Sequence, residues 1–179
     1  MREEQQLYLL GEADFEDVWR IMEASFPPEE RREKEKQQKL LKEEERYRLF
    51  GGFRDGKLIG FLAAWQFPDF HFVEHFAVES SERGSGFGQR MLAMVMQKAG
   101  GRIVLEVEPP EDEKKKRRIG FYERNGFVLN DYPYIQPAMA ETTEPIPLMI
   151  MSTAGALTEE EFSEIRRQLY HSVYLQKNI

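Results

Sequence analysis

A glycine-rich segment is the part of this sequence whose residue types and spacing point most directly to chemistry. It reads Arg83-Gly84-Ser85-Gly86-Phe87-Gly88 and leads into an amphipathic stretch, shortly after a strand-like run that ends at Val78. Glycine lets the backbone approach a ligand closely, and the first N–H groups of a helix have no partner inside the helix. Because a helix N-terminus also carries partial positive charge, this segment predicts a site for a phosphate or pyrophosphate group.

Two common phosphate-binding patterns can be compared with this segment. A nucleoside triphosphatase loop ends in Gly-Lys-Ser/Thr, whereas Gly88 is followed by Gln89, which excludes that class. The dinucleotide fingerprint matches at Gly84 and Gly86, and Glu106 lies about twenty residues further on, but Gln89 replaces the third glycine. A dinucleotide-binding domain is therefore an incomplete match, and it would require a parallel sheet.

Two segments in a fixed order make a more specific pattern. The first is Arg-x-x-Gly-x-Gly at Arg83, Gly86 and Gly88, and the second is Phe121-Tyr122-Glu123-Arg124-Asn125-Gly126-Phe127. One strand-like segment separates them, and the stretch from about 47 to 130 resembles the GNAT superfamily of N-acetyltransferases. The resemblance implies an α/β fold with a mixed, mainly antiparallel sheet that is splayed at its centre and flanked by helices. Residues 1–179 are expected to form a single acetyl-CoA-binding acetyltransferase domain.

The resemblance also implies which residues contact the coenzyme. Backbone groups of three strand residues would hold the pantetheine and the acetyl carbonyl, and six residues of the glycine-rich segment would enclose the pyrophosphate: Phe76, Ala77 and Val78, then Arg83, Gly84, Ser85, Gly86, Phe87 and Gly88. Lys115, in the basic run 114–118, would meet the 3′-phosphate, although such a run usually forms a solvated face. The family commonly has Asn where this chain has Lys115.

Acetyl transfer needs a proton for the departing thiolate, and the resemblance places Tyr122 beside the coenzyme sulfur. A tyrosine with an ordinary pKa of about 10 stays protonated at neutral pH and can donate to a thiolate whose conjugate acid lies near 8.5. We therefore expect Tyr122 to be the general acid. The alternative is that Tyr122 packs in the core with Phe121 and Phe127.

Transfer to an amine also needs a base, and Glu74 on the expected central strand is the best candidate. In a regular strand Glu74 shares a face with Phe72 and Phe76, and His75 points the other way. A bulge would reverse this parity and give the position to His75. Glu106, on the next strand, is a candidate for positioning the substrate amine or a water, with an ordinary ion pair as the alternative.

Composition restricts the class of protein. The chain has 179 residues, 41% of them hydrophobic, and a formal net charge of -7, which argues against a nucleic-acid partner and weakly favours a cationic amine acceptor. No cysteine is present and three scattered histidines lack metal-ligand spacing, so we expect direct acetyl transfer and no metal. No membrane span or signal peptide is recognisable, and a cytoplasmic location is expected.

These expectations combine into an acetyl-CoA-dependent N-acetyltransferase that acts directly on an amine of a small molecule, peptide or protein. The acceptor is not identified by the sequence. The alternative is a non-catalytic acyl-CoA-binding sensor or partner-binding protein on the same fold. The charged second helix and the terminal helix are candidates for a homodimer contact.

Several elements must position these residues. Hydrophobic periodicity, caps and turns predict strands over 6–10, 47–53, 57–67, 70–78, 103–107, 127–130 and 148–152, and helices from 14, over 29–46, 86–98 and 116–125, and from 158. Asp55-Gly56 predicts a tight hairpin, which argues for antiparallel pairing. The residues 132–147 are expected to form an irregular loop.

Overall fold

The computed structural model describes residues 6–176, which divide into two units. The first contains residues 6–28 and 32–103, and the second contains residues 29–31 and 104–176. The glycine-rich segment and Glu74 lie in the first unit, whereas Tyr122, Glu106 and Lys115 lie in the second.

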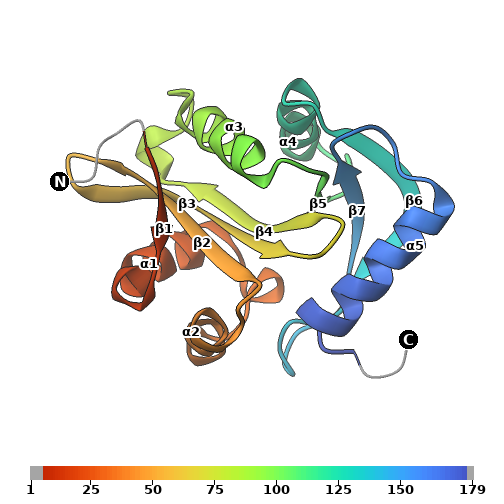
Figure 1. The fold of residues 1–179 in the computed structure, drawn as a ribbon, viewed down its shortest axis with the longest axis horizontal. Coiled ribbons are helices and arrows are strands. Elements are labelled where there is room, and N and C mark those ends of the chain that lie inside the picture. Colours follow the sequence, from red (N-terminus) through yellow and green to blue (C-terminus); the bar gives the residue numbers. More distant parts are fainter. Residues whose placement is uncertain (1–5, 177–179) are drawn as a thin grey trace. The chain divides into compact units, whose positions relative to one another are not determined.

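Four strands form the sheet of the first unit, in the order β1-β2-β3-β4 with antiparallel pairing throughout (Figure 1). Their bounds are Leu7–Leu10 for β1, Tyr47–Arg54 for β2, Lys57–Gln66 for β3 and His71–Val78 for β4. Between β2 and β3, Asp55 and Gly56 have φ angles of 49° and 78°. Two successive positive φ angles are typical of the type I′ turn, so the hairpin expected from Asp-Gly is confirmed.

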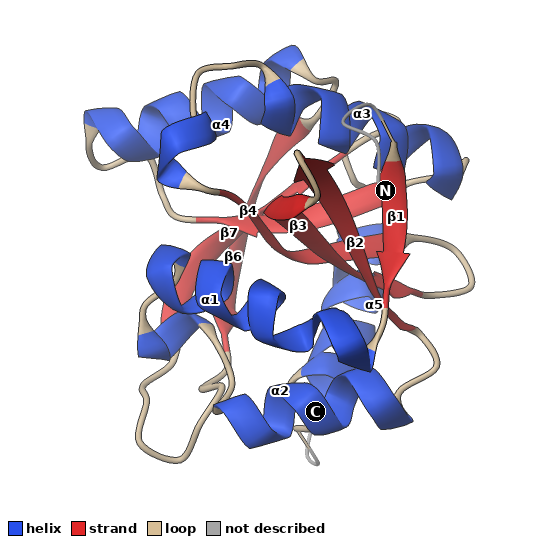
Figure 2. Cartoon of the chain, turned by 90° about the vertical axis from the view of Figure 1, so that its left-hand side faces the viewer, coloured by secondary structure: helices blue, strands red, loops and turns tan. Residues whose placement is uncertain are grey.

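Helices cover both faces of this sheet. α1 (Phe15–Ser25) and α2 (Lys34–Glu43) lie on one face and α3 (Phe87–Ala99) lies on the other, as Figures 1 and 2 both show. The expected helix over 29–46 is shorter than predicted, because a separate 3-10 turn occupies Pro28–Glu30 and the backbone is already extended at Glu44. The break between that turn and α2 allows Arg32 to turn inward, where it is buried.

Three antiparallel strands form the sheet of the second unit in the order β5-β7-β6. Their bounds are Ile103–Val107 for β5, Val128–Gln136 for β6 and Ile146–Ser152 for β7. The predicted loop over 132–147 is confirmed only for residues 137–145. Its ends were wrong, because β6 continues to Gln136 after an irregularity in register between Asn130 and Tyr134, and β7 begins at Ile146. Pro133 lies inside that irregularity, where a missing N–H costs no ladder hydrogen bond.

Two helices complete the second unit, and both contact β6. α4 spans Glu113–Arg124, and α5 spans Glu159–Gln168 before a π-helical turn at Leu169–Val173. α4 begins three residues earlier than predicted because the Asp112 side chain accepts a hydrogen bond from the Lys115 N–H at 2.9 Å and caps the helix. Within residues 6–176, no helix is long and apolar enough to cross a bilayer.

Candidate functional site

The glycine-rich segment forms the exposed turn that leads into α3. Gly84 and Gly86 have φ angles of 80° and 76°, in the left-handed region that strains any residue with a side chain. Gly86 occupies the N-cap position, and α3 begins at Phe87. The glycines at these two positions are therefore required by the backbone path of the turn.

Several backbone N–H groups of this turn point away from any protein acceptor. Among the residues that the structure describes, the N–H groups of Gly86, Gly88 and Gln89 form no hydrogen bond. The N–H of Phe87, by contrast, donates to Ser85 Oγ at 3.3 Å. Unpartnered N–H groups at the positive end of a helix can bind an anion, and the assignment of this turn as a phosphate site stays a prediction.

The strand before the turn carries the residues expected to contact pantetheine. The side chains of Phe76 and Val78 are half-buried and pack against the cluster of Ile59, Phe87 and Met91. Phe87 is 3% exposed, so its side chain belongs to the core and only its backbone can face a ligand. Ala77 is buried and Arg83 is exposed. The assignment of these residues to coenzyme binding stays a prediction.

A β-bulge changes which residues of β4 share a face. Ala63 pairs with His75 and the next residue, Ala64, pairs with Val73, so Glu74 is an extra residue in β4. β4 is therefore not a regular strand and contains the bulge that was considered as an alternative, whereas the transfer of the base position to His75 stays a prediction. The His75 ring lies 4.8 Å from the Phe26 ring, just after α1, and Glu74 also faces the α1 and α2 side. The bulge thus brings two adjacent ionisable side chains to one face.

Glu74 is held in a buried ion pair that the sequence did not predict. Its Oε1 lies 2.7 Å from Arg32 Nη2, and its Oε2 accepts a hydrogen bond from Trp65 Nε1 at 3.0 Å. Burial by itself would raise the pKa of Glu74, but Arg32, His75 and Trp65 together hold that pKa below its ordinary value. Glu74 is therefore ionised at neutral pH and is a weak proton acceptor in this arrangement.

The ion pair continues into a chain of buried polar side chains. Arg32 Nη1 donates to Gln37 Oε1 at 3.4 Å, and Gln37 Nε2 donates to the Tyr47 hydroxyl at 2.7 Å. Burial raises the pKa of Tyr47 far above its ordinary range. In the sequence, the one hint of this network is an uncharged glutamine, Gln37, within a strongly charged helix.

Tyr122 lies on α4, in the second unit, and is 9% exposed. Its ring makes edge contacts with Phe121 and Phe127, at centroid distances of 5.3 Å and 5.5 Å, so the packing anticipated as an alternative is present. Its hydroxyl forms no hydrogen bond with the residues described here. Burial raises the pKa of Tyr122 to about 12, although Arg118 acts in the opposite direction, so the hydroxyl keeps its proton at neutral pH. Its role as the acid stays a prediction.

Glu106 is held by two buried tyrosines of the second unit. The Tyr174 hydroxyl lies 2.8 Å and 2.7 Å from the two carboxylate oxygens, and the Tyr134 hydroxyl donates to Oε1. Burial and the nearby carboxylate raise the pKa of Tyr134 well above its ordinary value. Tyr174 follows the π-helical turn at the end of the chain, and no sequence signal linked it to Glu106. The expected role of Glu106 toward the substrate stays a prediction.

Lys115 is engaged with acidic neighbours. Its Nζ lies 2.9 Å from Glu111 and 3.6 Å from Glu108, and the hydrogen bond to Glu111 raises the pKa of Lys115. A coenzyme phosphate would have to compete with these carboxylates, and the predicted contact is untested. Across residues 6–176, no three His, Cys, Asp or Glu side chains are grouped so as to hold a metal ion.

Comparison with known proteins adds to this geometry. A family model described as "Acetyltransferase (GNAT) family" matches residues 15–127. The curated protein "Putative acetyltransferase YjbC" of Bacillus subtilis is 28% identical over 116 residues, which cover 63% of this chain and 60% of that protein. The match to YjbC therefore spans less than two thirds of its length.

Solved structures share the fold. A structure from Bacteroides thetaiotaomicron, named "putative acetyltransferase from GNAT family", is 34% identical, covers 96% of this chain and 99% of its own, and has a TM-score of 0.89. The ribosomal-protein-S18-alanine N-acetyltransferase of Escherichia coli is 19% identical with a TM-score of 0.63, covering 87% of this chain and 96% of its own. These matches confirm the expected α/β class with a mainly antiparallel sheet.

Proposed function

The chain belongs to the GNAT family of acetyltransferases, and we propose that it transfers the acetyl group of acetyl-CoA directly to an amine. Acetyl-CoA-dependent acetyl transfer is the general reaction of the family. The observation that carries the proposal is the glycine turn before α3, where the N–H groups of Gly86, Gly88 and Gln89 are available to an anion. In the proposed complex these groups bind the pyrophosphate, and residues 1–179 act as one acetyl-CoA-binding domain.

The proposed reaction is a direct displacement. The amine nitrogen attacks the thioester carbonyl carbon, a C–N bond forms, the C–S bond breaks, and the thiolate takes a proton from the Tyr122 hydroxyl. The amine nitrogen loses its proton at the bulge of β4, either to His75 or to a water held by the ionised Glu74 carboxylate. The chain contains no cysteine, so no thiol can carry the acetyl group between the two substrates. The Tyr122 hydroxyl has its pKa raised to about 12, so it carries a proton at neutral pH. The same shift makes it a weaker acid, so donation requires that the thiolate form directly beside it.

The acceptor is proposed to be a cationic amine. The formal net charge of -7 favours positively charged partners. Glu106 presents a carboxylate fixed by two phenols, which would attract an ammonium group and hold it in one orientation. The acceptor named for the Escherichia coli structure, an alanine of a ribosomal protein, belongs to that protein.

Release of free thiol from acetyl-CoA tests the proposed function. We expect thiol release that depends on an added amine, with acetylated products identified by mass from a pooled panel of polyamines, aminoglycosides and peptides. Initial rates with both substrates varied should give intersecting reciprocal plots, because direct attack requires both in one complex. Parallel plots would contradict direct transfer.

Calorimetry separates this proposal from its alternative. A non-catalytic acyl-CoA-binding sensor would bind acetyl-CoA and release no thiol with any amine in the panel. A protein that binds no acetyl-CoA would contradict both functions, and Gly86→Ala, which alters the turn, should weaken binding in either case.

A further inference from the structure

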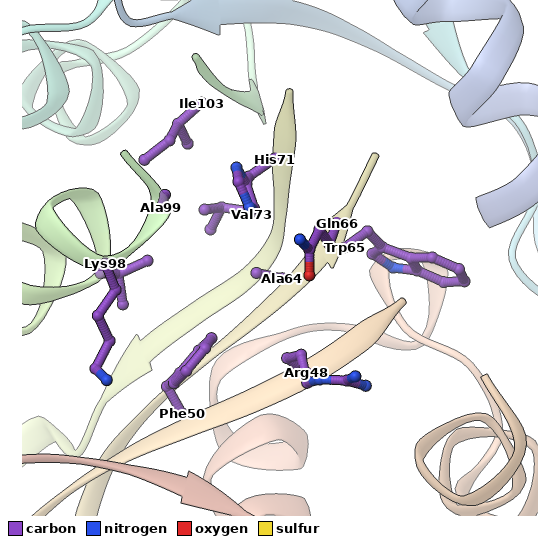
Figure 3. Close-up of a pocket in the computed structure, with 11 residues that line it drawn as sticks. Arg48, Phe50, Ala64, Trp65, Gln66, His71, Val73, Lys98, Ala99 and Ile103 are labelled. Atoms are coloured by element: carbon purple, nitrogen blue, oxygen red, sulfur yellow. The ribbon is translucent and has the colours of Figure 1, made fainter. Parts of the chain in front are cut away.

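A pocket in the first unit lies apart from the glycine turn. It has a volume of about 220 Å³ and lies between the C-terminal end of α3 and the face of the sheet formed by β2, β3 and β4 (Figure 3). α3 has 13 residues, so its two ends are about 20 Å apart. The glycine turn is at the first end and Lys98 and Ala99, which line the pocket, are at the second.

The charged side chains that line the pocket are all basic. Arg48 and Lys98 contribute cations, and none of the eleven lining residues is acidic, although the chain has 32 Asp and Glu against 25 Lys and Arg. The Lys98 side chain forms no ion pair or hydrogen bond with the described residues. The Arg48 side chain donates to the Tyr47 carbonyl at 3.2 Å and interacts electrostatically with Glu44. The pocket is thus a local site of positive charge in an acidic protein.

Hydrogen-bonding groups in the pocket are also unused. His71 Nδ1 is buried and has no hydrogen-bond partner in the described part of the chain, and the Gln66 side-chain amide forms no hydrogen bond there either. Burial lowers the pKa of His71, so its ring is neutral at pH 7 and carries one N–H. A buried ring nitrogen without a partner costs free energy unless a ligand or water satisfies it.

The rest of the lining is apolar and the space is small. Phe50, Val73 and Ile103 supply apolar surface, whereas the Trp65 indole is turned away from the pocket, toward Glu74 on the opposite face (Figure 3). Pockets for drug-sized ligands measure roughly 300–1,000 Å³, so this volume suits a smaller molecule. Apolar walls with cations at the edge fit a compact apolar body that carries one negative group.

We propose that this pocket binds a small aromatic or aliphatic carboxylate, with its apolar body against Phe50 and Val73 and its carboxylate facing Lys98, Gln66 and His71. The pocket lies at the opposite end of α3 from the glycine turn, and the proposal does not depend on the proposed function. No acetyl-CoA is needed for its test, so the two proposals fail independently.

Titration of the ¹⁵N-labelled protein with sodium benzoate, followed by two-dimensional NMR at constant ionic strength, tests the proposal. We expect saturable shifts of the backbone amides of His71, Val73 and Ala99. Benzamide, which is neutral, should bind at least about fivefold more weakly, and benzylamine should cause no saturable shift, because only the carboxylate is matched to the cations.

Two variants of pocket residues and one control variant locate the binding. Lys98→Glu should raise the dissociation constant for benzoate about five- to tenfold, whereas Lys42→Glu, the same charge change on an exposed lysine of α2, should leave it unchanged. Ala99→Phe should fill the pocket and abolish the shifts while the melting temperature reports that the chain is folded. Absence of saturable shifts up to about 10 mM benzoate, equal binding of benzylamine, or equal weakening by both lysine variants would overturn the proposal.

Discussion

The guanidinium of Arg32 lies 2.7 Å from the carboxylate of Glu74, with side-chain exposures of 11% and 2%. This ion pair joins the connection before α2 to the bulge in β4. A bulge leaves one residue outside the normal pairing, and here that residue is the glutamate that Arg32 and Trp65 hold. The pair therefore stabilises both the bulge and the position of Glu74.

Removal of the cation should destabilise the fold. Arg32→Met leaves a buried carboxylate without its cation, and breaking such a pair costs about 3–5 kcal/mol. Urea denaturation of the variant and the wild type measures this loss in the free energy of unfolding. Lys39→Met is the matched control, because it breaks the exposed pair with Glu43 at 3.8 Å and should cost under about 0.5 kcal/mol. Equal effects of the two variants would show that the buried pair adds no stability.

The same pair predicts a dependence of stability on pH. The folded-state pKa of Glu74 is lowered from 4.5, so its contribution is present above pH 4.5 and is lost as pH falls through the lower folded value. In Arg32→Met, burial dominates and raises the pKa of Glu74, so lowering the pH from 7 to 5 should increase the stability of the variant relative to the wild type. Urea midpoints across this range measure the difference. If the difference in stability between the variant and the wild type stayed constant from pH 7 to pH 5, Arg32 would not be the group that lowers the pKa of Glu74.

The glycine turn should tolerate no side chain at Gly86. Gly86→Ala places a Cβ on a residue with φ of 76°, and the N–H groups around it must shift. Loss of one charge-assisted hydrogen bond, worth about 1.5–3 kcal/mol, should weaken acetyl-CoA binding by roughly 10- to 100-fold in calorimetry. Gly101→Ala is the control, since nothing lies within 4 Å of its added Cβ and its φ lies outside the positive range. Unchanged binding in Gly86→Ala would argue against the turn as the pyrophosphate site.

The hydroxyl of Tyr122 should matter for catalysis more than for folding. Tyr122→Phe removes a hydroxyl that makes no hydrogen bond with the described residues and keeps the ring contacts with Phe121 and Phe127. If this hydroxyl supplies the proton, kcat should fall about 10²–10⁴-fold with little change in melting temperature. Tyr8→Phe, on β1, is the control for the substitution itself. A fall below about threefold would remove Tyr122 from the proton transfer.

The hydrogen bonds from two tyrosines to Glu106 predict that a substitution there changes KM for the amine and not KM for acetyl-CoA. Tyr174→Phe removes the donor that lies 2.8 Å and 2.7 Å from the Glu106 oxygens, and hydrogen bonds to charged groups are worth about 1.5–3 kcal/mol. Stability should fall by that amount, and KM for the amine should rise while KM for acetyl-CoA stays constant. Tyr132→Phe, which loses one neutral bond to the Leu157 carbonyl at 3.0 Å, should cost only about 0.5–1.5 kcal/mol and leave both KM values unchanged. A change in KM for acetyl-CoA alone would place Glu106 outside the acceptor site.

Features encoded by neighbouring residues could be predicted from the sequence. Asp55-Gly56 forms the hairpin turn. Thr158 and Glu161 form a capping box at the start of α5, in which the Thr158 hydroxyl accepts from the Glu161 N–H at 3.2 Å and the Glu161 carboxylate accepts from the Thr158 N–H at 2.8 Å. The glycine turn before α3 and the end of α4 at Gly126 likewise have glycine where the backbone takes a positive φ. In each case the conformation depends on the residue types at adjacent positions, so local chemistry is sufficient.

Features that depend on a distant partner could not be predicted in this way. A bulge in β4 was an open alternative, but its position at Glu74 is fixed only by the register between β3 and β4. The extension of β6 likewise depends on its pairing with β7. Arg32 reaches Glu74, and Tyr174 reaches Glu106, across long separations in the chain. The amino-acid order therefore specified the family, the glycine turn and the short turns, while packing selected which face each acidic side chain takes and what holds it. The physical reason is that a turn is set by the dihedral preferences of a few residues, whereas a buried charge is set by whichever groups the folded chain brings against it.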